Sequence, residues 1–265
     1  MAQQPIRFDD GAAYDRGMGR WSLLAGQVFL EWLAPAPGLR WIDVGCGSGV
    51  FTELLIQRCA PAETQGIDPS EAQLSFARTR PAAHGAVFLQ GDAMALPFEA
   101  GRFDAAVMAL VIFFVPDPAK GVGEMARVVR PGGTVAAYAW DLAGGGFPFE
   151  PIHAELRAVG ATPSAPPSPD ASREATLRDL WTGAGLEAVE TREITVHRTF
   201  ADFEDFWNSS TSTTGTMRAT FAAMAASELE LFKARLRARL PADAQGRITY
   251  AARANAIKGR VPGAA

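Results

Sequence analysis

WIDVGCGSG, residues 41–49, is a short apolar strand that runs into a glycine-rich turn. A helical pattern follows from Val50 to about Cys59, so the turn leads into the N-terminus of a helix. Glycine accepts positive φ and lets the backbone approach a ligand closely, and the first N–H groups of a helix have no partner within it. A strand, a glycine-rich turn and a helix in this order are typical of a site that binds a nucleotide-type cofactor.

The spacing of the glycines narrows the choice of cofactor. A dinucleotide site favours G-x-G-x-x-G, which seats a pyrophosphate, whereas Gly45, Gly47 and Gly49 follow the spacing G-x-G-x-G. The acid before them, Asp43, would repel a pyrophosphate but suits a cationic amino group. The turn therefore favours a cofactor that carries an amino group.

Two further acids lie at the ends of predicted strands. Asp68 ends a strand at 64–68, where a carboxylate can accept both hydroxyls of a ribose. Asp92 follows a strand at 86–90, where it can meet an adenine amino group. An amino-acid part, a ribose and an adenine describe S-adenosylmethionine better than a nicotinamide dinucleotide.

The rest of the chain continues the alternation of strands with helical or loop segments. Together with 41–44, the predicted strands are 64–68, 86–90, 103–110, 134–140, 186–198 and 248–257. Strands that are apolar on both faces indicate a parallel sheet covered by helices, and right-handed crossovers make it doubly wound. We predict an α/β fold with a mostly parallel, seven-stranded, Rossmann-like sheet and a cap of helices and loops from insertions flanking the sixth strand.

This pattern divides the chain into segments with different roles. We expect an N-terminal helical segment over the cofactor site (1–39), a cofactor-binding core (40–140), cap insertions (141–180 and 199–246) and segments that complete the sheet (181–198 and 247–258). The first insertion is rich in Gly, Pro, Ser and Ala over 143–176, which predicts a loop or lid.

The sequence also predicts the apolar faces and the ends of individual helices. The four-residue spacing of Leu24, Val28 and Trp32 predicts the apolar face of an N-terminal helix. A helix that follows Asp117 is expected to stop at residues 131–133, Pro-Gly-Gly. The spacing of apolar residues over 221–240 predicts one continuous helix, with Glu228 as its polar exception.

Composition excludes several classes of protein. The 265 residues carry 25 Lys and Arg against 29 Asp and Glu, a net charge of −4, and no basic block, so we expect no nucleic-acid partner. The sequence shows no signal peptide and no apolar run of 18 residues, so we expect a cytoplasmic protein without stable membrane association. Cys46 and Cys59 have no His or Cys at ligand spacing, and we expect no metal site.

Five stretches together resemble the class I S-adenosylmethionine-dependent methyltransferases, in the branch that includes ubiquinone/menaquinone-biosynthesis and small-molecule methyltransferases. They are WIDVGCGSG (41–49), GIDPS (66–70), LQGDAMALPF (89–98), FDAAVMALVIFFVPDP (103–118) and EMARVVRPGG (124–133). YDRGMGRWS (14–22) also resembles an N-terminal segment that lies over the cofactor in some members. The family carries its substrate specificity outside the shared core, so the resemblance names no acceptor.

The resemblance implies the residues that hold S-adenosylmethionine, whose product is S-adenosylhomocysteine. Those near its methionine and ribose parts would be Asp43, Gly45, Cys46, Gly47, Ser48, Gly49 and Asp68. Those near the adenine would be Pro69, Ser70, Gly91, Asp92, Ala93 and Met94. Those near the amino-acid part and the reacting sulfur, or in the covering segment, would be Met108, Ala109, Leu110, Tyr14, Arg20 and Trp21.

The acceptor side departs from the family. Many relatives have a His or Asn where Phe113 and Phe114 stand here, which favours an apolar acceptor site. A thiol or carboxylate acceptor needs no base, whereas a phenol, alcohol or carbon acid does, and the candidates are His153, His197 and Tyr14.

We therefore expect methyl transfer to a small, apolar or aromatic acceptor by a monomer or homodimer. A non-catalytic protein that binds S-adenosylmethionine or S-adenosylhomocysteine and an NAD-dependent oxidoreductase remain as alternatives.

Overall fold

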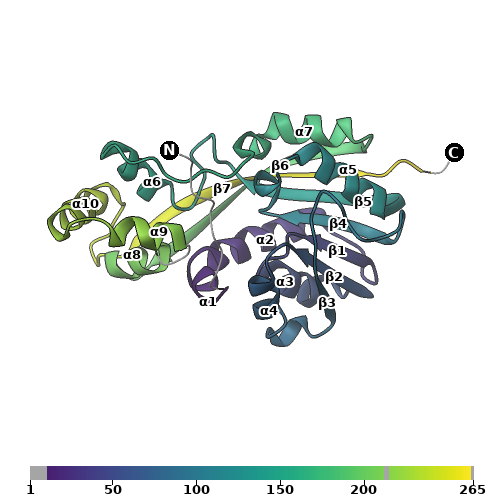
Figure 1. Ribbon diagram of the computed structural model, residues 1–265, viewed down its shortest axis with the longest axis horizontal. Helices are drawn as coiled ribbons and strands as arrows, with labels where there is room; N and C mark the ends of the chain where they lie inside the picture. Colours follow the sequence, from purple (N-terminus) through teal and green to yellow (C-terminus); the bar gives the residue numbers. More distant parts are fainter. Residues whose placement is uncertain (1–10, 212–214, 264–265) are drawn as a thin grey trace.

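The computed structural model describes residues 11–211 and 215–263, and a seven-stranded sheet runs through its centre (Figure 1). The strands are β1 (Arg40–Val44), β2 (Glu63–Asp68), β3 (Ala86–Gln90), β4 (Phe103–Ala109), β5 (Val129–Trp140), β6 (Glu187–Phe200) and β7 (Ile248–Arg260). Their order is β3-β2-β1-β4-β5-β7-β6; the first five pair in parallel, and β7 is antiparallel to β5 and β6. The predicted mostly parallel, Rossmann-like fold is confirmed.

Helices cover both faces of this sheet. Figure 1 shows α2 (Arg20–Leu33) and α3 (Val50–Cys59) on one side and α5 (Pro118–Val128) and α7 (Glu174–Gly183) on the other. The chain passes from β1 to β2 in one direction and returns to place β4 on the opposite side of β1. A ligand crevice forms at such a reversal, outside the carboxyl ends of the strands. The turn after β1 lies at this point.

The apolar face predicted for α2 packs against the core, but it is not the most buried stripe of the helix. The predicted residues are only half-buried: Leu24, Val28 and Trp32. The residues that enter the core are Trp21, Ala25 and Phe29, each with 0% of its surface exposed. Because both sets are apolar and four residues apart, periodicity alone does not distinguish them. The half-buried set lies at the border of the core, where the Lys258 ammonium stands 4.6 Å from the Trp32 ring centroid.

The Pro-Gly-Gly sequence at 131–133 was expected to separate α5 from the next strand. It lies within β5 instead. The helix ends at Val128 and the strand begins at Val129. Val129 pairs with Phe103, but the next pair joins Ala105 to Thr134, so the register shifts and β5 is irregular between these positions. An irregularity of this kind accommodates residues that a regular ladder excludes.

We expect the substitution Gly133→Ala to lower the free energy of unfolding by about 1–3 kcal/mol. A Cβ on Gly133 would lie 2.6 Å from the carbonyl oxygen of Asp104 and 2.9 Å from that of Arg130. These are backbone atoms, so the clash cannot be relieved by a side-chain rotation. Urea denaturation measures the change.

Gly123→Ala is the matched control for this substitution. Gly123 lies within α5, and a Cβ there meets open space. Replacing glycine in a helix by alanine is expected to stabilise the protein by roughly 0.5–1 kcal/mol. Equal stability of the two variants would contradict the tight packing at Gly133.

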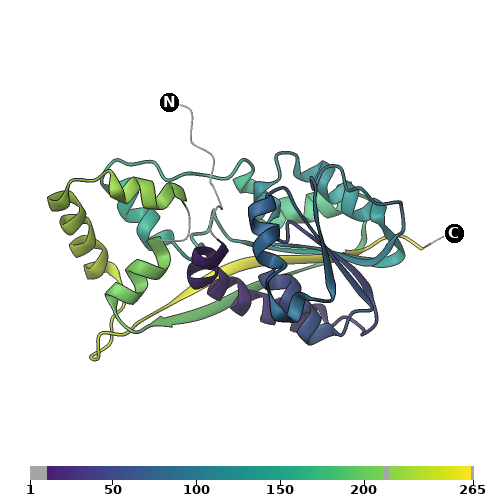
Figure 2. The same cartoon turned by 60° about the horizontal axis from the view of Figure 1, so that its bottom comes forward.

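The second half of the chain adds a helical cap beyond the parallel sheet. Figure 2 shows β6 and β7 extending past the other strands and carrying helices at their far end. These helices are α6 (Glu150–Ala158), α8 (Phe203–Thr211), α9 (Gly215–Ala222) and α10 (Ala226–Arg239). Within the described residues, no helix is both long and apolar enough to cross a membrane.

Two predictions for the cap were wrong. The expected loop at 143–176 contains α6, which has Pro151 in its first turn, where the missing N–H costs nothing. The expected single helix over 221–240 is divided between α9 and α10. Glu228 marks the division, because its carboxylate accepts a hydrogen bond from the Ala225 N–H at 3.1 Å and caps α10.

Candidate functional site

The glycine-rich turn after β1 is fixed to the end of β2. The N–H groups of Gly45 and Cys46 both donate to the carbonyl of Ile67, at 2.7 and 2.9 Å. Gly45 has φ of +77°, and a Cβ there would overlap the Val111 side chain. The turn therefore needs glycine for both its conformation and its close contact.

Asp68 connects this turn to the start of the next helix. Its Oδ2 accepts from the Gly47 N–H at 2.9 Å, and its Oδ1 accepts from the Ser70 N–H at 2.8 Å. Burial raises the pKa of Asp68, and the two backbone hydrogen bonds oppose that shift. A carboxylate has about four acceptor positions, so about two remain available to a ligand.

Asp43, at the end of β1, is fully buried beside the turn. Thr52 Oγ1 donates to Asp43 Oδ2 at 2.6 Å, while Oδ1 has no hydrogen-bond partner among the described residues. Burial, followed by the charge of Asp68, raises the pKa of Asp43 to about 7. An unpaired buried carboxylate oxygen of this kind favours a cationic ligand.

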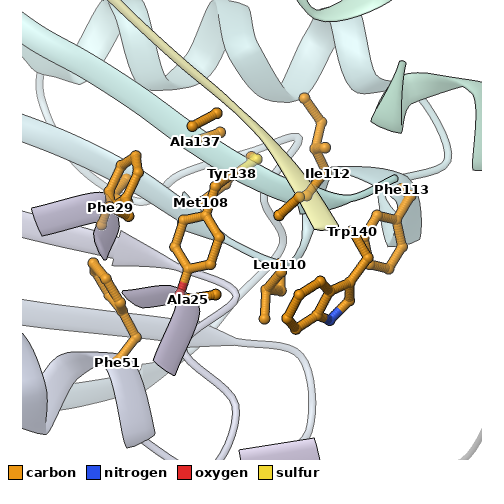
Figure 3. Close-up of a cluster of buried hydrophobic side chains, with 14 of the residues drawn as sticks. Ala25, Phe29, Phe51, Met108, Leu110, Ile112, Phe113, Ala137, Tyr138 and Trp140 are labelled. Atoms are coloured by element: carbon orange, nitrogen blue, oxygen red, sulfur yellow. The ribbon is translucent and has the colours of Figure 1, made fainter. Parts of the chain in front are cut away.

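Tyr138 on β5 lies in the same region and was not predicted. Its ring packs against those of Phe29 and Phe51, with centroids 4.7 and 5.8 Å away (Figure 3). Its buried hydroxyl also has no hydrogen-bond partner in the part of the chain that the structure describes. Burial, with a further contribution from the charge of Asp43, raises its pKa well above the usual value.

These groups border a first cavity of about 480 Å³. The predicted cofactor residues that line it are Tyr14, Asp43, Gly45, Cys46, Gly47, Ser48, Asp68, Pro69, Ser70, Gly91, Asp92, Ala93, Ala109 and Leu110. The lining residues that the sequence analysis did not name as cofactor contacts include Ser22, Phe51, Tyr138 and the loop 165–167. The loop is fixed there because the Ser168 N–H donates to the carbonyl of Phe113 at 3.0 Å.

Five of the predicted cofactor residues do not line this cavity: Gly49, Met94, Met108, Arg20 and Trp21. Trp21 belongs to the core, where its ring centroid lies 5.2 Å from that of Tyr250. Met108 is fully buried, and Arg20 is exposed. These residues are close in sequence to lining residues but do not themselves line the cavity.

The N-terminal segment lies against the glycine-rich turn through a charged network. The segment comprises α1 (Gly11–Tyr14) and a π-helical turn, η1 (Asp15–Gly19). Arg80 pairs with Asp15, donates to the Ser48 carbonyl and pairs with Glu53 at 2.9 Å. Tyr14, held beside this network, lines the first cavity.

A second cavity of about 440 Å³ adjoins the first. The two share the lining residues Tyr14, Leu110, Phe114, Ala165 and Pro166. Most other walls of the second cavity are aromatic or aliphatic, among them Phe113, Trp140, Phe147, Phe149, Leu156 and Met217. The arrangement can hold two ligands in contact, one beside the glycine-rich turn and one among apolar side chains.

The three predicted base candidates lie in different surroundings. His153 lines the second cavity, where burial lowers its pKa to about 4. Tyr14 lines both cavities, and its pKa is raised chiefly by burial. His197 lies on the exposed face of β6 and lines neither cavity. No group of three or more metal-ligating side chains occurs among residues 11–211 and 215–263.

Comparisons with known proteins match this arrangement. A family model described as a methyltransferase domain matches residues 42–137. An uncharacterized protein from Mycobacterium tuberculosis is 32% identical over 201 residues, which cover 71% of this chain and 72% of that protein. A demethylmenaquinone methyltransferase from Thermus thermophilus is 38% identical over 116 residues, 43% of this chain and 51% of that enzyme. The YcgJ protein from Bacillus subtilis shares the fold, with a TM-score of 0.58, 16% identity and coverage of 92% and 100% of the two chains.

The matched region contains the glycine-rich turn, Asp43, Asp68 and Asp92. The cofactor is S-adenosylmethionine, as the resemblance implied, and the activity is methyl transfer. This chain belongs to the class I S-adenosylmethionine-dependent methyltransferases.

Proposed function

We propose that this enzyme methylates a small, apolar or aromatic acceptor by direct in-line displacement. The observation that carries the proposal is the pair of adjoining cavities, one beside the glycine-rich turn and one with aromatic walls. Residues shared by both, such as Tyr14 and Leu110, lie where the two ligands would meet. The acceptor would therefore approach the cofactor from the second cavity.

The polar groups of the first cavity fit the parts of S-adenosylmethionine. The unpaired Oδ1 of Asp43 would accept from its ammonium, and the Tyr138 hydroxyl lies on the same cavity. Asp68 would use its remaining acceptor positions for the ribose hydroxyls. Asp92 and Ala93 would meet the edge of the adenine. When bound, the cofactor supplies an electrophilic methyl group on a sulfonium sulfur.

The protein contributes orientation and the exclusion of water. Holding two reactants in near-attack geometry supplies a large part of such a rate enhancement. The aromatic walls of the second cavity, including Phe113 and Phe149, keep water from the reacting centre and strengthen local electrostatics. We further propose a cytoplasmic enzyme, monomeric or dimeric, without a nucleic-acid partner, which its net charge of −4 supports.

Calorimetric titration with S-adenosylmethionine and S-adenosylhomocysteine tests the proposed site. We expect micromolar binding of both, followed by methylation of a compound in a panel of phenols, carboxylic acids, thiols and amines. Absence of binding at millimolar concentrations would contradict the assignment of the first cavity.

We expect Arg80→Met to weaken binding of S-adenosylhomocysteine about tenfold, which corresponds to about 1.4 kcal/mol. Arg80 joins Asp15 of the N-terminal segment to Ser48 of the glycine-rich turn, and its side chain is only 13% exposed. Without it, the segment that carries Tyr14 loses the ionic part of its attachment to the turn, while the hydrogen bond from Ser48 Oγ to Asp15 Oδ1 at 3.0 Å remains. Arg178→Met is the control, because Arg178 forms an exposed pair with Glu174 away from both cavities. Equal affinities of the two variants would show that the network does not support binding.

A further inference from the structure

The second cavity carries no net charge at neutral pH. Among the described residues that line it, four titrate: Tyr14, Glu150, His153 and Arg157. Glu150 and Arg157 form an ion pair on α6, so their charges cancel. Tyr14 is neutral at pH 7, and burial raises its pKa further. A charged ligand entering this cavity would lose its hydration without gaining a counter-ion, which is costly.

His153 is the uncharged polar side chain that α6 places in this cavity. Its ring lies 5.1 Å from that of Phe147, centroid to centroid. Burial, followed by the charge of Arg157, lowers the pKa of His153 to about 4, so the imidazole is neutral at physiological pH. A neutral imidazole has one nitrogen that accepts a hydrogen bond.

Trp140 lines the same cavity and carries a donor without a partner among the described residues. It ends β5, two residues beyond Tyr138, and Figure 3 shows its indole beside Leu110 and Phe113. The side chain is 1% exposed, and its Nε1–H has no hydrogen-bond partner in the described part of the chain. A buried donor without a partner costs free energy, and a ligand atom that accepts from it would remove that cost.

We propose that the second cavity binds an uncharged aromatic hydroxyl compound, with Trp140 donating to its oxygen and His153 accepting its proton. A hydroxyl both donates and accepts, so one group satisfies the imidazole and the indole together. An ether or a hydrocarbon would leave at least one of them unpaired, and a thiol is weak in both roles. This inference rests on the proposed function, because it names the acceptor of that reaction.

The weak basicity of His153 selects a phenol over an aliphatic alcohol. The phenol oxygen forms a bond to the methyl carbon as the carbon–sulfur bond breaks, and the sulfur keeps that electron pair. The phenol proton passes to the free ring nitrogen of His153, which then releases it to solvent. An oxygen that is gaining a methyl group becomes strongly acidic, so a base with a low pKa accepts its proton as the new bond forms. A phenol is more acidic than an aliphatic alcohol before the reaction starts, so it loses its proton to a weak base more readily.

Three probes of one ring size test the charge of the ligand: 2-naphthol, 2-naphthoate and 2-naphthylmethylammonium. We expect 2-naphthol to bind the protein saturated with S-adenosylhomocysteine at least tenfold more tightly than either ion, measured by calorimetry. Tighter binding of the carboxylate or the ammonium would overturn the proposal, as would no binding of any of the three.

Variants of His153 test its role in the reaction. We expect His153→Gln, which keeps a hydrogen-bond acceptor, to lower kcat for 2-naphthol methylation about 100-fold and to change KM less than threefold. His153→Phe is expected to lower kcat at least as far while S-adenosylhomocysteine still binds. The control is His197→Phe, because His197 is exposed and lines neither cavity. Unchanged kcat in both His153 variants would overturn the role of the imidazole.

These measurements distinguish an error in the acceptor class from an error in the cofactor site. If S-adenosylhomocysteine binds but a carboxylate or an amine is methylated in place of 2-naphthol, the acceptor class is wrong and the proposed function stands. If S-adenosylhomocysteine does not bind, the cofactor site itself is wrong.

Discussion

Asp68→Ala is expected to abolish the stabilisation of this protein by S-adenosylhomocysteine. At 100 times its dissociation constant, the ligand should add about 2.7 kcal/mol to the free energy of unfolding of the unsubstituted protein. The substitution removes the proposed partner of both ribose hydroxyls and also the acceptor of the Gly47 and Ser70 N–H groups. Loss of the ribose contacts and loss of the hydrogen bonds that hold the turn should both weaken binding of S-adenosylhomocysteine, so the thermal shift should disappear.

Measurements without ligand separate these two effects. Asp117→Ala is the matched control, because Asp117 also accepts a backbone N–H, that of Lys120 at 3.1 Å, and lies outside the first cavity. Each variant should lose about 1 kcal/mol or more from its missing backbone hydrogen bonds. Only Asp68→Ala should lose the ligand effect. A full thermal shift in that variant would refute the assignment of Asp68 to the ribose.

The first cavity could be predicted in large part because its residues follow strand ends. Gly45, Asp43, Asp68 and Asp92 each come directly after or at the end of a strand. In a parallel sheet these ends meet at one edge, so sequence position alone brings the residues together. The unusual glycine spacing and the acids then identify the chemistry.

Tyr138 and Trp140 could not be assigned to the site in this way. They belong to the run Thr134–Trp140, which is apolar on both faces, so no alternation shows which face meets a cavity. Whether their polar atoms find partners depends on the helices and loops packed against them. Such unpaired groups are a property of the tertiary structure, and the sequence contains no local signal for them.

The cap was predicted less well because three of its helices, α6, α8 and α9, are short and because the segment 143–176 is rich in residues typical of loops. The proline-rich composition of 143–176 concealed α6, and with it the place of His153 in a cavity. The exposed His197 and the half-buried His153 are alike in sequence terms, since each is a single histidine with a glutamate within four residues and no second histidine or cysteine at ligand spacing. Only burial within the cap distinguishes them.

Binding of S-adenosylmethionine is expected to weaken about fivefold from pH 7 to pH 6 and about tenfold for each pH unit below that. The Asp43 carboxylate must be ionised to hold the ammonium group, and burial raises its pKa to about 7 in the free protein. About half of the protein is therefore ionised at Asp43 at pH 7, and about one tenth at pH 6. Calorimetry from pH 5 to 8.5, in buffers of different ionisation enthalpy, measures the affinity and the proton released on binding.

Asp43→Asn is expected to raise the stability of the free protein at pH 8 and to weaken its binding of S-adenosylmethionine. In the unfolded chain an Asp ionises near pH 4, so the raised pKa of Asp43 destabilises the folded protein progressively between about pH 4 and pH 7. A difference of about three pKa units corresponds to about 4 kcal/mol, which the amide should recover at pH 8 and not at pH 4. The same variant should bind S-adenosylmethionine weakly and without pH dependence. An unsubstituted protein whose affinity is constant from pH 5 to 8.5 would show that Asp43 does not hold the ammonium. The buried carboxylate would then have to be explained by its hydrogen bond to Thr52 alone.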